Sequence, residues 1–158
     1  MGKVSVLVAV GLVLLLGSGS VSVAHHAGGV EVGDENGSVV GQPFKELPVD
    51  ADLVAIETGG LKMWYPPVTI LDLKVRPGRP VVLRVTNKSS VERGFLMTAD
   101  GAFEAPTVLK AQVVLKPGES RYIGVPLSDL LYATSGSTFV YRDHLNPTES
   151  GGKLLLIK

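Results

Sequence analysis

Two proline–glycine turns, each set between runs of alternating apolar and polar residues, constrain the fold of this 158-residue chain more than any other feature. Proline presets φ for such a turn, and glycine accepts the positive φ that other residues avoid. Apolar side chains at every second position mark strands with one buried face. The two strand–turn–strand units are Thr69–Val75, Arg76–Arg79 and Val81–Thr86, and then Val108–Leu115, Lys116–Glu119 and Arg121–Val125.

Further short β-prone runs lie at intervals of about ten residues, as in sandwiches and barrels. These runs are Leu53–Glu57, Gly94–Thr98, Thr138–Tyr141 and Leu154–Ile157. The 10 prolines and 19 glycines, spread along the chain, argue against long helices. One short helix is expected in Pro126–Ser135, with Leu127, Leu130 and Leu131 facing the core. The sequence therefore predicts an all-β fold with at most one short helix.

Residues 1–24 have the pattern of a secretory signal peptide. Lys3 is followed by the uncharged apolar run Val4–Leu16, and Ser22–Ala24 offers small residues for cleavage. An uncleaved N-terminal anchor is the alternative, and it would be the chain's only attachment to a membrane. Either interpretation predicts a periplasmic or secreted protein. We expect residues 25–51, rich in glycine and acidic residues, to be a flexible arm, and residues 52–158 to be the folded domain.

Composition excludes several classes of function. Fifteen basic residues balance fifteen acidic ones, so nothing points to nucleic acid as a partner. The chain has no cysteine, which excludes disulfides, thiolate metal sites and iron–sulfur clusters. No phosphate loop, dinucleotide fingerprint or nucleophile elbow is present, so we do not expect an enzyme.

The C-terminal stretch Thr138–Lys158 is the candidate for a functional site. A β-rich run enters a polar loop that holds His144, and Gly151–Gly152 then leads into the last apolar run. Strand, histidine-bearing loop, glycine and closing strand is an order in which a β-sandwich can build a metal pocket at one end.

Together with the two turns, this tail gives residues 52–158 a resemblance to the cupredoxins. The segments that carry it are Val68–Asn87, Gly94–Phe95, Leu115–Val125 and Phe139–Lys158. The resemblance implies a cupredoxin-like Greek-key β-sandwich. In the family, one copper-ligating histidine precedes a Gly-Phe step, and a cysteine, a second histidine and often a methionine follow near the C-terminus.

Only one of those ligand positions is preserved here. The resemblance implies Arg93 at the first histidine, Tyr141 or Arg142 at the cysteine, His144 at the second histidine, and Glu149 or Ser150 near the methionine. A blue-copper site needs a thiolate and two imidazoles, so this site cannot form from these residues. The resemblance thus implies the fold without its usual electron-transfer chemistry.

Two arginines beside the expected metal position suggest a replacement for the metal. We hypothesise that Arg93 or Arg142 pairs with Glu92, Asp143 or Glu149 and occupies the place of the cation. The simpler alternative is that both arginines are ordinary surface charges.

A different copper site is the alternative at the N-terminus. If cleavage follows Ala24, the mature chain begins with His25 and His26, and an amino-terminal histidine can bind copper through its amino group and imidazole. His144 is a candidate for a third nitrogen ligand, and nitrogen donors in a plane suit Cu(II).

The sequence as a whole favours an exported binding or structural module that has a protein partner and no cofactor. An accessory or subunit of an extracytoplasmic redox complex fits this description. The alternatives are a copper carrier that uses His25, His26 and His144, and an electron-transfer partner protein.

Overall fold

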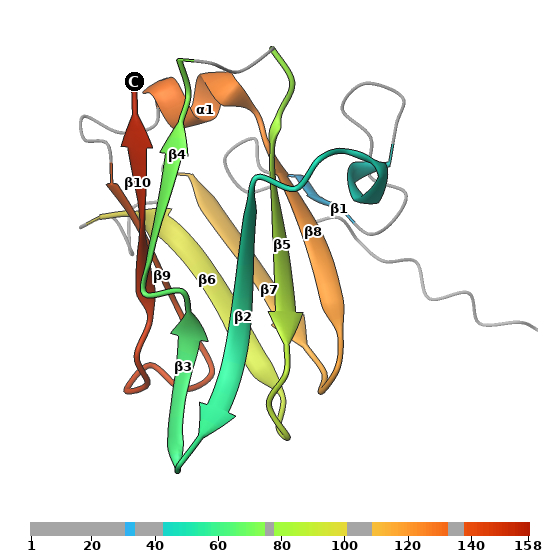
Figure 1. Ribbon diagram of the computed structural model, residues 1–158, viewed down its shortest axis with the longest axis vertical. Helices are drawn as coiled ribbons and strands as arrows, with labels where there is room; N and C mark the ends of the chain where they lie inside the picture. The colour runs from blue at the N-terminus through green and yellow to red at the C-terminus, as the bar shows by residue number, and fades with distance from the viewer. Residues whose placement is uncertain (1–30, 34–42, 75–77, 101–108, 133–137) are drawn as a thin grey trace, which may run out of the picture.

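Two five-stranded sheets packed face to face form the body of the protein in this computed structural model (Figure 1). The structure describes residues 31–33, 43–74, 78–100, 109–132 and 138–158. Besides strands, these residues contain a 3-10 turn, Phe44–Glu46, and one helix, α1, Leu127–Tyr132. The strands are β1 Glu31–Gly33, β2 Ala51–Thr58, β3 Leu61–Tyr65, β4 Val68–Asp72, β5 Val81–Asn87, β6 Arg93–Ala99, β7 Lys110–Leu115, β8 Ser120–Val125, β9 Thr138–Arg142 and β10 Gly152–Ile157. The predicted all-β architecture with at most one short helix is confirmed.

Strand order shows that the chain crosses repeatedly between the sheets. One sheet has the order β1-β8-β5-β2-β3 and the other β4-β10-β9-β6-β7. The pairs β2–β5 and β4–β10 are parallel, and the remaining pairs are antiparallel. The chain passes from one sheet to the other between β4 and β5 and between β7 and β8, the two places where the sequence has a proline–glycine pair. These crossovers agree with the predicted Greek-key sandwich and differ from a simple meander.

The core lies between the sheets and draws on both of them. In β5, Val81, Leu83 and Val85 are fully buried, as the alternation predicts. Three aromatic rings pack together within the core. The centroid of Phe95 lies 5.1 Å from that of Trp64, in an edge-to-face contact, and 6.1 Å from that of Tyr141. Such pairs add to the free energy gained by burying the rings.

Two parts of the expected flexible arm contact the sandwich, so the expectation is wrong for them. β1 pairs with β8 at the edge of its sheet. The Phe44 side chain is fully buried, and a Cβ at Gly124 would overlap its ring. Phe44 therefore lies over the outer face of the sheet beside Val82, which is also fully buried and pairs with Gly124. A three-residue strand and a single buried ring leave no periodicity to detect in a sequence.

In helix α1, one of the three leucines expected to face the core, Leu131, does not. Leu130 is fully buried and Leu127 packs against the core, but Leu131 is 36% exposed. Neighbouring positions on a helix point about 100° apart, so Leu130 and Leu131 do not both face the core of a six-residue helix. Within the described ranges, no helix has the length and apolar character needed to cross a bilayer. The predicted signal peptide, residues 1–24, lies outside them.

Candidate functional site

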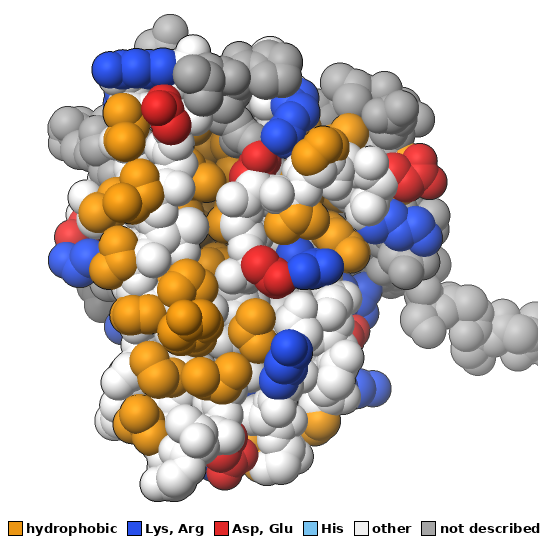
Figure 2. Space-filling model, in the orientation of Figure 1, with side chains coloured by type: hydrophobic (Ala, Val, Ile, Leu, Met, Phe, Trp, Pro, Cys, Tyr) orange, Lys and Arg blue, Asp and Glu red, His pale blue; other side chains and the backbone are white. Residues whose placement is uncertain are grey.

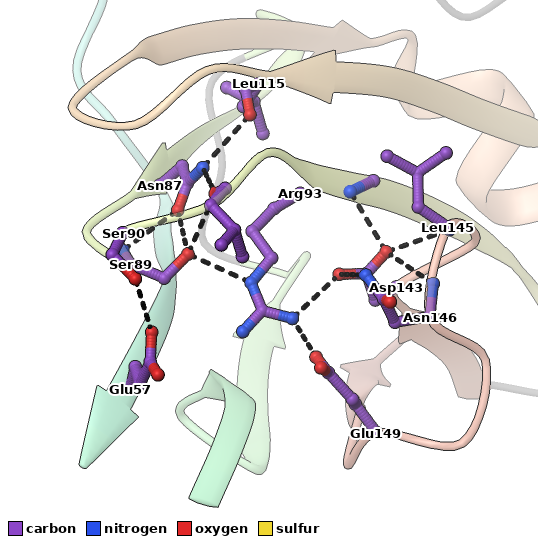
Figure 3. A network of polar contacts seen from close by, with 12 residues as sticks. Glu57, Asn87, Ser89, Ser90, Arg93, Leu115, Asp143, Leu145, Asn146 and Glu149 are labelled. Carbon is purple, nitrogen blue, oxygen red and sulfur yellow. Dashed lines mark hydrogen bonds and ion pairs between the residues drawn. The ribbon is translucent and has the colours of Figure 1, made fainter. Parts of the chain in front are cut away.

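Arg93 occupies the first position of β6, at the end of the sandwich where β5, β7 and β9 also finish. Its neighbour two positions on, Phe95, belongs to the core, and alternate side chains of a strand share a face. The Arg93 side chain therefore enters the space between the sheets, where only 1% of it is exposed. Figure 3 shows its guanidinium between Ser89 on one side and Asp143 and Glu149 on the other.

Two carboxylates from the C-terminal loop bind this guanidinium. Arg93 Nη1 lies 3.2 Å from Asp143 Oδ2 and also donates to Glu149 Oε2. Asp143 is as deeply buried as Arg93, and Glu149 is 18% exposed. Of the three carboxylates proposed as partners, the structure thus brings two to Arg93, while Glu92 is exposed. A buried arginine needs such partners, because an uncompensated charge in the interior is very costly.

Asp143 also organises the loop that follows it. Its Oδ1 accepts hydrogen bonds from the backbone amides of Leu145 and Asn146, at 2.9 and 3.1 Å, and of Gly94 at 3.0 Å. The first two are the local bonds by which an aspartate closes a turn on its own backbone. The bond to Gly94 ties the turn to β6. One carboxylate therefore fixes both the loop and the arginine.

Asn87 and Ser89 hold the other side of the guanidinium, and the sequence reasoning did not identify them. Arg93 Nε donates to Ser89 Oγ at 3.0 Å, and Ser89 Oγ donates to Asn87 Oδ1 at 2.7 Å. Asn87 Nδ2 donates to the carbonyls of Val91 and Leu115, at 2.7 and 3.0 Å. An asparagine at a strand end with a serine two residues later is a known turn pattern, and it was the available signal. We call Asn87, Ser89, Arg93, Asp143 and Glu149 the Arg93 network.

His144 lies on the opposite face of β6 from the Arg93 side chain. A Cβ built on Gly94 would come within 2.5 Å of His144 Nδ1, so the imidazole covers the face towards which Gly94 points. That face is the outer one, because Arg93 and Phe95 face inwards. Nδ1 is buried and has no hydrogen-bond partner among the described residues. Burial lowers the pKa of His144 below its ordinary value, and the Asp143 carboxylate opposes this shift.

Tyr141 and Arg142, the two candidates for the cysteine position, point to opposite faces of β9. Tyr141 is buried in the core, and its hydroxyl donates to the carbonyl of Pro66. Burial raises its pKa. The ring fills the space over Gly152, where a Cβ would overlap it. Arg142 is half-buried on the outer side, in register with Leu96 of β6.

The residues present do not fit a type 1 copper ion. The chain has no cysteine to supply the thiolate. His144, the histidine that the resemblance places at a ligand position, faces away from Asp143 and Glu149 across β6, and these two carboxylates already hold a cation. Within the described part of the chain, no group of three or more His, Cys, Asp or Glu side chains is arranged to hold a metal. His25 and His26 lie outside the described residues.

The chain was compared with protein families, curated proteins and solved structures. No protein-family model matches the sequence, and a search of curated proteins finds no significant match. Among solved structures, a mutant of amicyanin is similar at 9% identity and a TM-score of 0.46, covering 72% of this chain and 89% of that one.

Two further solved structures are similar to this chain. A purple cupredoxin from Nitrosopumilus maritimus has 14% identity and a TM-score of 0.44, and the match covers 68% of this chain and 100% of that one. Auracyanin A, a "blue" copper protein from Chloroflexus aurantiacus, has 14% identity and a TM-score of 0.46, covering 67% of this chain and 96% of that one.

Proposed function

We propose that this chain is an exported cupredoxin-like binding module in which the Arg93 guanidinium takes the place of a metal ion. The observation that carries the proposal is the burial of Arg93 between Asp143 and Glu149, at the position where the family resemblance expects the first histidine. A guanidinium stays charged at any pH of interest, so it is a permanent cation at this point.

Electrostatics support a metal-free site at this position. One positive charge stands between two carboxylates, and a divalent cation there would lie within a few ångströms of the guanidinium. At such distances two like charges in a partly dry environment repel by several kcal/mol. Arginine and a metal ion are therefore alternatives, and the chain carries the arginine.

The same network supports a role in binding. It joins the loop that precedes β6 to the loop between β9 and β10, and these loops carry the exposed side chains of Val91, 41% accessible, and Leu145, 45% accessible. Loops fixed by buried hydrogen bonds lose little conformational entropy on association. We propose a protein partner at this loop end, and the signal-like residues 1–24 favour a partner outside the cytoplasm, such as a subunit of a redox complex.

Metal analysis of the natively exported protein tests the first part of the proposal. We expect substoichiometric copper by elemental analysis and no bound Cu(II) signal by electron paramagnetic resonance after copper addition and buffer exchange. Stoichiometric copper retained through His25, His26 or His144 would support the copper-carrier alternative and contradict the proposal. Alanine variants of these three histidines would assign the ligands.

Cross-linking in the native membrane or periplasmic fraction tests the binding role. The exported protein is compared with Leu145→Asp, which alters the loop surface, and with Leu131→Asp, an exposed apolar position on α1 at the other end of the sandwich (Figure 1). We expect one major cross-linked protein that is lost with Leu145→Asp and kept with Leu131→Asp. Equal cross-linking by all three proteins would exclude the loop end as the binding surface.

A further inference from the structure

A second exposed apolar surface lies along one side of the sandwich, where β3 and β4 form the edges of their sheets. Leu61 and Tyr65 of β3 are each 53% exposed, and Val68 and Ile70 of β4 are 50% and 61% exposed. Ile157 of β10, in register with Asp72, adds a further 44% exposed side chain. Figure 2 shows hydrophobic side chains gathered on this side of the molecule.

The open edge of β4 carries unused backbone hydrogen-bonding groups. Lys153 N donates to Pro67 O, and Leu73 N donates to Ile157 O, both at 2.9 Å, so the odd-numbered residues of this strand bond to β10. Backbone groups alternate in direction along a strand. Val68 and Ile70 therefore direct their N–H and C=O groups away from β10, and β10 is the only strand that pairs with β4 in the described sheet.

Features that usually prevent strand addition stand at both ends of this edge and leave its middle open. Natural edge strands carry charged side chains, bulges or proline where another strand would pair. The other edge of the same sheet, β7, presents Lys110 and Gln112 on its outer face. On β4, Pro66 and Pro67 precede the strand and the exposed Asp72 ends it, whereas Val68 to Leu71 contain no charge and expose the apolar Val68 and Ile70. A further strand can therefore pair with β4 only over this uncharged middle part, Val68–Leu71.

We propose that β4 pairs with β4 of a second copy of this chain, which forms a twofold-symmetric dimer with a continuous ten-stranded sheet. An antiparallel pair centred on Thr69 sets Val68 opposite Ile70 of the copy, and Ile70 opposite Val68. Both residues then use their free N–H and C=O groups in the hydrogen-bonded positions of an antiparallel ladder. The edge is thus complementary to itself, as a twofold interface requires. This inference is independent of the proposed function.

Sedimentation velocity of the exported protein, from about 1 to about 100 µM, tests the dimer. We expect a concentration-dependent shift from monomer to dimer. Ile70→Lys places a charge at the centre of the pair, and we expect it to be monomeric throughout while keeping the wild-type circular dichroism spectrum. Val114→Lys on β7 is the matched control and should behave as wild type. A wild-type monomer over the whole range, or a dimer that survives Ile70→Lys, would overturn the proposal.

Cross-linking tests the register directly, because the natural chain has no cysteine. In the proposed register Thr69 faces its own copy as a non-hydrogen-bonded pair, with Cα atoms about 4.5 Å apart. That separation falls within the range for a disulfide. We expect mild oxidation to convert Thr69→Cys to a disulfide-linked dimer, and Lys116→Cys, far from this edge, to stay monomeric. Equal cross-linking of both variants, or none of Thr69→Cys, would exclude this register.

Discussion

The guanidinium of Arg93 and the backbone amide of its neighbour Gly94 bind the two oxygens of a single carboxylate, Asp143. Oδ2 lies 3.2 Å from Arg93 Nη1, and Oδ1 accepts from Gly94 N at 3.0 Å. One charged side chain therefore joins the start of β6 to the loop after β9 by both a side-chain and a backbone contact.

Removing the arginine charge should destabilise the protein strongly. Arg93→Met keeps much of the apolar stem but leaves Asp143 and Glu149 without their cation. Breaking one partner of a buried pair costs about 3–5 kcal/mol, because the remaining charge is uncompensated. Urea unfolding measures the change in the free energy of unfolding.

The matched control is Arg84→Met, whose pair with Asp52 is 41% and 42% exposed. Exposed pairs contribute about 0–1 kcal/mol, so this variant should stay close to wild type. Equal effects of the two substitutions would show that the buried network does not stabilise the fold beyond a surface pair.

Replacing the arginine with histidine should create a metal site. Arg93→His removes the permanent cation and sets an imidazole beside Asp143 and Glu149, and imidazole and carboxylate ligands suit Zn²⁺ and Co²⁺. We expect visible absorption on Co²⁺ addition. Zn²⁺ at about 100 times its Kd should raise the free energy of unfolding by about 2.7 kcal/mol. Arg84→His is the control at an exposed position. A folded Arg93→His protein that binds neither ion would contradict the view that Arg93 occupies a cation position.

We expect the folded state to lose stability as the pH is lowered, because His144 becomes protonated. Burial places its folded pKa below the ordinary value of 6.5, so the unfolded chain binds a proton more readily. The stabilising effect of neutral His144 is complete above that value. It is lost progressively as the pH falls through 6.5, and the loss ends below the folded pKa.

His144→Gln removes this titration and keeps a polar side chain over Gly94. Urea midpoints of wild type and variant, measured from about pH 8 to about pH 5, should diverge in favour of the variant as the pH falls. Lys110 also lowers the pKa of His144, so Lys110→Gln should reduce the divergence. Parallel pH profiles for wild type and His144→Gln would show that the imidazole does not titrate in this range.

Phe44 should anchor the segment before β2. Phe44→Ala removes a fully buried ring, which costs about 3–5 kcal/mol. Gly124→Ala forces a methyl group against the same ring and should cost about 1–3 kcal/mol. The free energy of unfolding of the double variant should fall by less than the sum of the two single effects, since the added methyl group fills part of the space left by the ring. Val49→Ala, at a 36% exposed site, is the control. Strict additivity would show that ring and glycine are not in contact.

Strands with one buried face were predictable, and strands without that pattern were not. In Val81–Thr86 the alternation is clear, and the structure has β5 at Val81–Asn87. β3, Leu61–Tyr65, contains no such alternation, and its hairpin turn depends on Gly59 and Gly60, both at positive φ. The alternation of apolar and polar residues indicates that one face of a strand is buried. It does not indicate which distant strand pairs with it.

The pairing of Arg93 was predictable because it depends on charge and on approximate position. The face on which His144 lies was not. Successive residues of a strand point to opposite faces, so a displacement of one residue between Asp143 and His144 decides which of them meets Arg93. Loop residues have no period that fixes this choice. Asn87 and Ser89 escaped notice because their roles depend on Leu115 and Arg93, which the fold alone brings close.

Arg93 has a further consequence for how the folded state depends on its surroundings. A bound metal stabilises a protein by mass action, so that stability varies with the free metal concentration and falls when a chelator is present. The guanidinium is covalently part of the chain, and its local concentration beside Asp143 and Glu149 is set by the fold. The contacts that close this end of the sandwich are therefore the same in metal-poor and metal-rich surroundings.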